Sequence, residues 1–95
     1  VWTANPEGAF VAPQESWQRY TGQTWNEHQG WSWLDAIHPE DRAHVHQLWR
    51  RAVAGRKLFE VQGRIWRKSD ETWRWFQARG VPIFHREDEV AEWVG

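Results

Sequence analysis

Hydrophobic and polar residues recur at two spacings along the chain, helical in its middle and alternating toward its end. Between residues 39 and 54 the apolar positions at helical spacing are Val45, Leu48, Trp49, Ala52 and Val53. Pro39 suits a first helical position because it has no N–H to leave unpaired, and Glu40 and Asp41 lie where the helix dipole is positive. The pattern predicts a helix over residues 39–54, capped at its C-terminus by Gly55.

From residue 58 onward the hydrophobic period changes to two, which predicts strands. Residues 58–67 alternate apolar and polar side chains, residues 73–84 follow after a Ser-Asp-Glu turn, and residues 90–94 form a last strand. Proline cannot donate to a strand ladder, so Pro82 predicts either that the second of these strands is an edge or that its pairing ends there.

The first 37 residues carry shorter signals. Residues 1–4 and 9–12 are strand candidates on either side of an Asn-Pro-Glu-Gly turn, and they are predicted to form a hairpin. Residues 14–21 predict a short helix that stops at Gly22, and residues 23–37 predict short helical turns and loops. This order of elements predicts an α+β fold, a five-stranded antiparallel sheet with short helices and one long helix packed on one face.

The composition indicates a folded domain with a core of large rings. The 95 residues include ten Trp, four Phe and one Tyr, whereas disordered chains are poor in aromatic residues. The chain has no cysteine, which excludes disulfides, thiolate metal sites and a cysteine nucleophile. It also has no methionine, so we expect residues 1–95 to be a single domain excised from a longer protein.

Charge is unevenly distributed, with sums of −5 over residues 1–41, +8 over 42–86 and −4 over 87–95, which add to the net −1. Interleaved Arg and Trp can bind nucleic acid by stacking, but we expect the Arg side chains to cover Trp faces on the domain's own sheet. No apolar run approaches the roughly 18 residues of a membrane span. We therefore expect neither nucleic acid nor direct membrane contact.

Four runs of residues carry a family resemblance: WQRYTG at 17–22, IHPEDR at 37–42, WRWF at 73–76 and EWVG at 92–95. Together they resemble a PAS domain with its C-terminal PAC motif, in the Trp-rich subfamily common in bacterial signalling proteins. The family usually has glycine in the turn that here contains Asp70-Glu71, and before the last strand, where Asp88-Glu89 stands. Because a positive φ is costly without glycine, we expect both hairpins to use different turn types.

The resemblance implies a signal-sensing and dimerisation input module of a bacterial signal-transduction protein. The implied parent is a sensor histidine kinase of a two-component phosphorelay, or a diguanylate cyclase, with its effector domain in the same chain. Such a module is cytoplasmic, although the parent can be tethered to a membrane. We expect no catalysis by this segment because it has no phosphate-binding loop and no nucleophile motif. A ligand-free interaction and dimerisation domain, or a haem-based gas sensor, are the alternatives.

Candidate site residues follow from the predicted faces. We expect a cavity between the long helix and the sheet that can hold a small molecule, unless Trp rings fill it. Its expected wall residues are Trp49, Val53, Phe59, Phe76 and Ala78. A homodimer interface on the outer sheet face is expected from Trp73, Trp75, Val81 and Ile83.

Cofactor chemistry is restricted by the residues present. Without cysteine a cysteinyl-flavin adduct is excluded. His46 falls near the position of the haem ligand in PAS haem sensors, but it borders the apolar face of the helix instead of lying at its centre. We therefore expect no cofactor, and retain haem only as the alternative.

Overall fold

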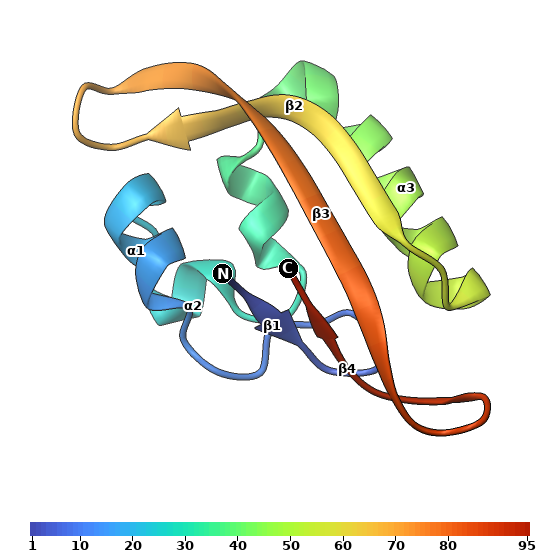
Figure 1. Cartoon of the computed structure of the whole chain (residues 1–95). Helices are drawn as coiled ribbons and strands as arrows, with labels where there is room; N and C mark the ends of the chain where they lie inside the picture. The colour runs from blue at the N-terminus through green and yellow to red at the C-terminus, as the bar shows by residue number, and fades with distance from the viewer.

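The computed structural model describes all 95 residues, and its longest helix, α3 (Pro39–Gly55), lies behind an antiparallel sheet (Figure 1). The His-Pro-Glu-Asp-Arg run that opens α3 has a separate task for each polar residue. The imidazole Nδ1 of His38 accepts the Glu40 N–H at 3.1 Å and so caps the helix. The Arg42 guanidinium donates to the carbonyls of Leu34 and Ile37, both at 3.0 Å. The motif therefore fixes both the start of α3 and the turn before it.

The sheet has four strands, β1 (Thr3–Ala4), β2 (Phe59–Arg67), β3 (Thr72–Arg86) and β4 (Glu89–Val94), in the spatial order β1-β4-β3-β2. All neighbours are antiparallel. Pairing of β2 with β3 ends at Gly80, two residues before Pro82, so the expected end of pairing is found in this ladder. Pairing of β3 with β4 continues through Pro82 to Arg86, and β3 is an inner strand instead of an edge. Trp2 and Gly95 exchange backbone hydrogen bonds of 2.8 and 2.9 Å, so the two chain ends lie side by side.

The predicted fifth strand, residues 9–12, is wrong. Phe10 makes an isolated bridge to Gly30, and the first strand pairs with β4 instead of forming a hairpin with residues 9–12. The Asn5-Pro-Glu-Gly turn does form, since the Asn5 N–H donates to the carbonyl of Ala9 at 2.9 Å. After Phe10 the chain is exposed, with Val11 66% accessible, and Pro13 removes a ladder donor. The sheet therefore has four strands instead of five.

The short helical elements match the expectation for the first half. They are α1 (Glu15–Thr21), α2 (Trp25–His28) and η1 (Ser32–Ala36), a 3₁₀ turn. Helix α1 ends at Gly22, which takes a left-handed φ of 79° as predicted. Helix α2 begins with a capping box between Thr24 and Glu27, and the hydrogen bond from the Thr24 backbone N–H holds the pKa of Glu27 below its ordinary value.

Two turns use non-glycine residues at positive φ, which corrects the prediction at both places. The left-handed residue after α3 is Arg56 (φ 52°), because Gly55 is still helical. In the β2–β3 hairpin Glu71 takes φ 52°, so a non-glycine residue bears the backbone strain of the left-handed conformation there. The β3–β4 turn contains no positive φ.

The core lies between the helices and the inner sheet face. Strand β2 alternates as predicted, with Phe59, Val61 and Ile65 buried. Trp49 of α3 and Trp93 of β4 lie at the centre, 2% and 0% exposed, with ring centroids 5.0 Å apart. The aromatic residues thus supply the core that a chain of this length needs.

Candidate functional site

A small cavity of about 70 Å³ lies between α3, the N-terminal segment and the inner face of β2 and β3. Its wall is wholly apolar apart from one glycine, and is formed by Trp2, Gly8, Phe10, Trp17, Trp33, Ile37, Val45, Trp49, Phe59, Val61, Phe76 and Ala78. The volume leaves space for a few non-hydrogen atoms and is far below the roughly 300 Å³ at which drug-sized ligand sites begin. The cavity therefore suits a small neutral molecule without charged groups.

The cavity exists because small residues stand beside large ones in its wall. Ala78 neighbours Phe76 on the inner face of β3, and Gly8 lets the N-terminal turn approach α3 closely. The Trp49 indole N–H donates to the Gly8 carbonyl at 2.9 Å. A Cβ at Gly8 would lie 2.8 Å from a methyl carbon of Val53, so only glycine fits there without movement. The Trp49 ring is thereby fixed as the back wall.

Four of the five predicted wall residues line this cavity, namely Trp49, Phe59, Phe76 and Ala78. Val53 does not, because it lies one turn beyond Trp49 and contributes to surface hollows beside α3. The half of the wall contributed by residues before α3, Trp2 to Ile37, was not predicted. The sequence marked this half of the wall only by the density of Trp in that stretch. Because these residues show no periodicity, the sequence does not indicate which way their side chains point.

Trp33, one of the wall residues, has a buried polar atom without a hydrogen-bond partner, and this atom contributes nothing to the cavity surface. The indole nitrogen of Trp33 is buried and unpaired, whereas that of Trp17 donates to the side-chain oxygen of Gln23 at 2.6 Å. Trp33 packs against Phe10 with a centroid distance of 6.0 Å. A buried unpaired donor destabilises a fold by about 1–3 kcal/mol, so this wall carries a local energetic cost.

Histidines do not face the cavity. His46, the candidate haem ligand, packs edge-on against Trp31 at 5.2 Å and borders a hollow on the outside of α3. The geometry therefore offers no axial ligand to a group inside the cavity. No cluster of side chains suited to a metal ion is found either.

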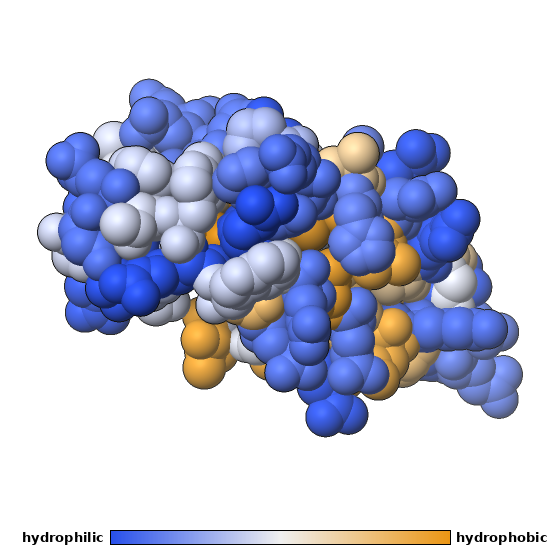
Figure 2. All heavy atoms as spheres, turned by 90° about the horizontal axis from the view of Figure 1, so that it is seen from above, coloured by the Kyte–Doolittle hydropathy of each residue, from blue (hydrophilic) through white to orange (hydrophobic).

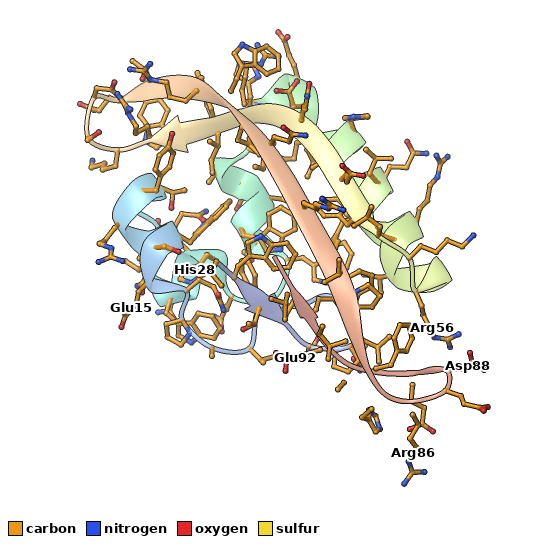
Figure 3. The ribbon with its side chains drawn as sticks, viewed as in Figure 1. Glu15, His28, Arg56, Arg86, Asp88 and Glu92 are labelled. Carbon is orange, nitrogen blue, oxygen red and sulfur yellow. The ribbon has the colours of Figure 1, made fainter.

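His28 is a buried polar residue that the sequence did not single out. It is 0% exposed and lies inward beneath α1, whereas Glu15 points outward (Figure 3). Its Nδ1 hydrogen-bonds to the Thr24 carbonyl at 2.7 Å, and its Nε2 accepts the Gln14 N–H at 3.1 Å. The Gln14 side chain then pairs with both backbone groups of Thr3 at 3.2 Å. This network ties α2 to the edge of β1.

The outer sheet face carries the predicted interface residues, but in two separate groups. Trp73, Trp75, Val81 and Ile83 are 37%, 73%, 39% and 43% exposed. At about 3.3 Å per residue Trp75 and Val81 lie about 20 Å apart, with Gln77 and Arg79 between them. Seen from above in Figure 2, the orange hydrophobic side chains lie among blue and pale ones. The outer face is therefore not one continuous apolar patch.

The tryptophans at the β2–β3 end of this face are partly covered. Trp73 packs against Trp66 at 5.2 Å and against His38 at 4.8 Å. Trp75 lies under the guanidinium of Arg64, whose Cζ is 5.3 Å from the ring centroid. This is the one cation–π contact of the domain, so the expected covering of Trp by Arg holds at this position alone.

Arg64 is held from its other side by carboxylates at the start of α3. Asp41 accepts from the backbone N–H, Nε and a terminal nitrogen of Arg64, each at 2.9 Å, and Glu40 accepts at 3.3 Å. The hydrogen bonds from Arg64 hold the pKa of Asp41 below its ordinary value, and Asp41 in turn raises the pKa of Arg64. Both side chains are charged throughout the neutral range.

Other acidic and basic groups pair locally. Arg74 binds Asp70, four residues before it in the chain. Hydrogen bonds from Arg67 first, then Arg74, hold the pKa of Asp70 well below its ordinary value.

None of the helices has both the length and the apolar character that a membrane span requires.

Comparison with known proteins agrees with this architecture. A family model described as PAS fold matches residues 10–95, and the chain belongs to this family of PAS domains. A protein of Sinorhizobium fredii (strain NBRC 101917 / NGR234), named uncharacterized protein y4lL, is 28% identical over 95 residues. The match covers 100% of this chain and 11% of that relative, so the chain spans about a tenth of its length.

A solved structure shows the same fold. It is a domain of a protein from Haloarcula marismortui, provisionally described as a light and redox sensing histidine kinase. The two superpose with a TM-score of 0.71 over 97% of this chain and 80% of the other, at 19% sequence identity. The family and the fold together define a PAS domain.

Proposed function

We propose that this PAS domain is the signal-input module of a larger sensor protein and that its signal is a small, neutral, apolar molecule held in the cavity between α3 and the sheet. The observation that carries the proposal is the cavity itself, about 70 Å³ with an apolar wall. Apolar cavities of this kind stay free of water and accept apolar guests, because water inside would have no hydrogen-bond partners.

The size and wall of the cavity restrict the ligand class. Charged ligands would lose their hydration without gaining a partner, at a cost of several kcal/mol or more. Ligands of a few non-hydrogen atoms, such as short hydrocarbons or dissolved gases, lose nothing of that kind. We therefore propose small apolar molecules as the ligand class of this cavity.

The parent protein in this proposal is a cytoplasmic or membrane-tethered sensor histidine kinase, with the effector domain in the same chain. Support comes from the fold shared with a domain of a provisionally described histidine kinase. The signal in that protein's description is light and redox state, but a cysteinyl-flavin adduct is excluded here because the chain has no cysteine. A ligand that enters and leaves the cavity is the better match to these residues.

Thermal denaturation in the presence of small hydrocarbons tests this function. A ligand that binds the folded state raises stability by RT ln(1 + [L]/Kd), which is about 2.7 kcal/mol at a hundredfold excess over Kd. The variant Ala78→Leu places side-chain atoms in the cavity and should abolish the rise. Ala54→Leu, on the outside of α3, is the matched control and should keep it. No rise in the native protein with any of a size series of hydrocarbons would contradict the proposal.

A second candidate function is a ligand-free dimerisation module, which the exposure of Trp75 favours. An exposed Trp beside an Arg is typical of an interface anchor. In a two-fold homodimer Trp75 would meet the same surface of a second copy. Trp75→Ala should then weaken self-association by about 2 kcal/mol or more, roughly 30-fold, in sedimentation equilibrium. Gln77→Ala, two residues along the same face, is the control; an equal effect of both substitutions, or a monomer at high micromolar concentration, would refute it.

A further inference from the structure

Arg64 connects the inner and outer sides of the sheet. It lies on β2, which forms one edge of the sheet, and its side chain starts on the outer face because its neighbours Gly63 and Ile65 point inward. From there the guanidinium passes around the edge to Asp41 and Glu40 at the first turn of α3. Its other contact is the exposed ring of Trp75. One side chain thus touches both α3 and the outer face.

The helix held by Arg64 also forms a wall of the cavity. Val45 and Trp49 line the cavity, and they follow Asp41 by four and eight residues, about one and two helical turns. Residues at this spacing lie on the same side of a helix. Asp41 is therefore the end of the α3 face that looks into the cavity.

The strand side of the contact reaches the cavity too. A Cβ built on Gly63 would lie 3.2 Å from the ring of Phe76, which lines the cavity, and 3.6 Å from the Cβ of Asp41. Asp41 thus packs over the strand backbone directly beside a cavity-lining ring. A shift of α3 or of Phe76 changes the position of the Asp41 carboxylate against Arg64.

We propose that Arg64 is a positioning residue that transmits the state of the cavity to the outer face. The position of α3 determines the position of the Asp41 carboxylate, which determines the position of the Arg64 guanidinium. The guanidinium in turn determines how much of the Trp75 ring is exposed. The inference rests on the proposed ligand function of the cavity. It assigns the regulation of the outer surface to one residue at the sheet edge.

The geometry requires arginine, because two guanidinium nitrogens bind the same carboxylate at once. Nε and a terminal nitrogen each donate to Asp41, while the Cζ of the same guanidinium lies over the Trp75 ring. Lysine keeps the charge but has neither the fork nor the planar face. Arg64→Lys therefore separates the geometric role from the charge.

The domain's own tryptophans can report the coupling. In ¹⁵N-labelled protein the indole N–H resonances of Trp33 and Trp49 report on the cavity, and that of Trp75 reports on the outer face; each is assigned by its Trp→Phe variant. Xenon is the probe, because it enters dry apolar cavities and makes no hydrogen bonds. Ala78→Leu, whose cavity is filled, controls for effects of pressure.

The expected result is that xenon moves the Trp33, Trp49 and Trp75 resonances of the native domain. In Asp41→Asn and in Arg64→Lys the cavity resonances should still move while Trp75 stays fixed. Asp70→Asn is the matched control: it removes a carboxylate of the same charge that binds Arg67 and Arg74, but it has no contact with α3. In this variant the native response of Trp75 should persist.

Each other outcome decides against the inference. If the cavity resonances move and Trp75 does not, the ligand function stands and the coupling through Arg64 is wrong. If Trp75 responds in Asp41→Asn and Arg64→Lys as in the native domain, the route does not pass through this ion pair. If no cavity resonance moves, both the proposed function and the inference fail. Should Asp41→Asn not fold, the native domain and Arg64→Lys still decide.

Discussion

Replacing Gly8 by alanine probes the contact that fixes the back wall of the cavity. Gly8 has a φ of +86°, where a side chain is strained by about 1–2 kcal/mol, and its added Cβ would meet Val53 at 2.8 Å and the Trp49 indole at 2.9 Å. Gly30 is the matched control, because its φ is +63° and its added Cβ would meet nothing within 4 Å. The two substitutions share the backbone strain and differ in the clash.

The magnitudes can be worked from these contacts. For Gly30→Ala the strain is offset by about 0.4–1 kcal/mol of lost freedom in the unfolded chain, which leaves about 0–1.6 kcal/mol of destabilisation. For Gly8→Ala overpacking adds about 1–3 kcal/mol, for a total of roughly 1–4.6 kcal/mol. At about 4–8 °C per kcal/mol for a domain of this size, Gly8→Ala should have a Tm at least about 4 °C lower than Gly30→Ala.

Urea denaturation and thermal unfolding followed by circular dichroism measure both variants. The reasoning requires Gly8→Ala to be less stable than Gly30→Ala by at least about 1 kcal/mol. Equal stabilities of the two variants would refute it, because they would show that the N-terminal turn does not press against Trp49 and Val53.

Three further predictions concern charge, capping and catalysis. Because Arg64 lowers the pKa of Asp41 in the folded state, this carboxylate stabilises the fold fully above its unfolded pKa, and the stabilisation is lost as the pH falls through its folded pKa. Asp41→Asn should therefore flatten the decline in Tm below about pH 4, whereas Asp88→Asn should not. Thr24→Ala removes the cap of α2 and should destabilise the domain by about 1 kcal/mol in urea denaturation, while Ser16→Ala in α1 should change little. The purified domain is expected to hydrolyse no ATP in a phosphate-release assay, and measurable turnover would contradict the expectation that this segment is not catalytic.

Elements with local signals could be predicted from the sequence. Helix α3 carries its start signal at Pro39 and a regular apolar face, and β2 carries strict alternation, so both lie within two residues of the predicted bounds. The predicted strand at residues 9–12 failed because strand formation depends on a partner, and the candidate partner strand pairs with β4, about 90 residues away in the chain. Local composition cannot decide which of two strands finds a neighbour.

The candidate site likewise has residues that local patterns predict and residues that depend on tertiary contacts. Phe76 and Ala78 could be placed in the cavity because alternation gives a strand two definite faces. The choice of Val53 was wrong because a helical stripe is wider than the part of it that meets a cavity. The N-terminal wall around Gly8, and the joining of Asp41 to Arg64 across 23 residues, depend on tertiary contacts that no periodicity marks.

The measurement that tests the central claim most directly is a crystal structure of the domain under xenon pressure. The account predicts a xenon site between Trp49 and Phe76, inside the cavity, in the native domain and its absence in Ala78→Leu. Xenon density confined to surface hollows such as the one beside His46, with the cavity closed by its own side chains, would contradict the account.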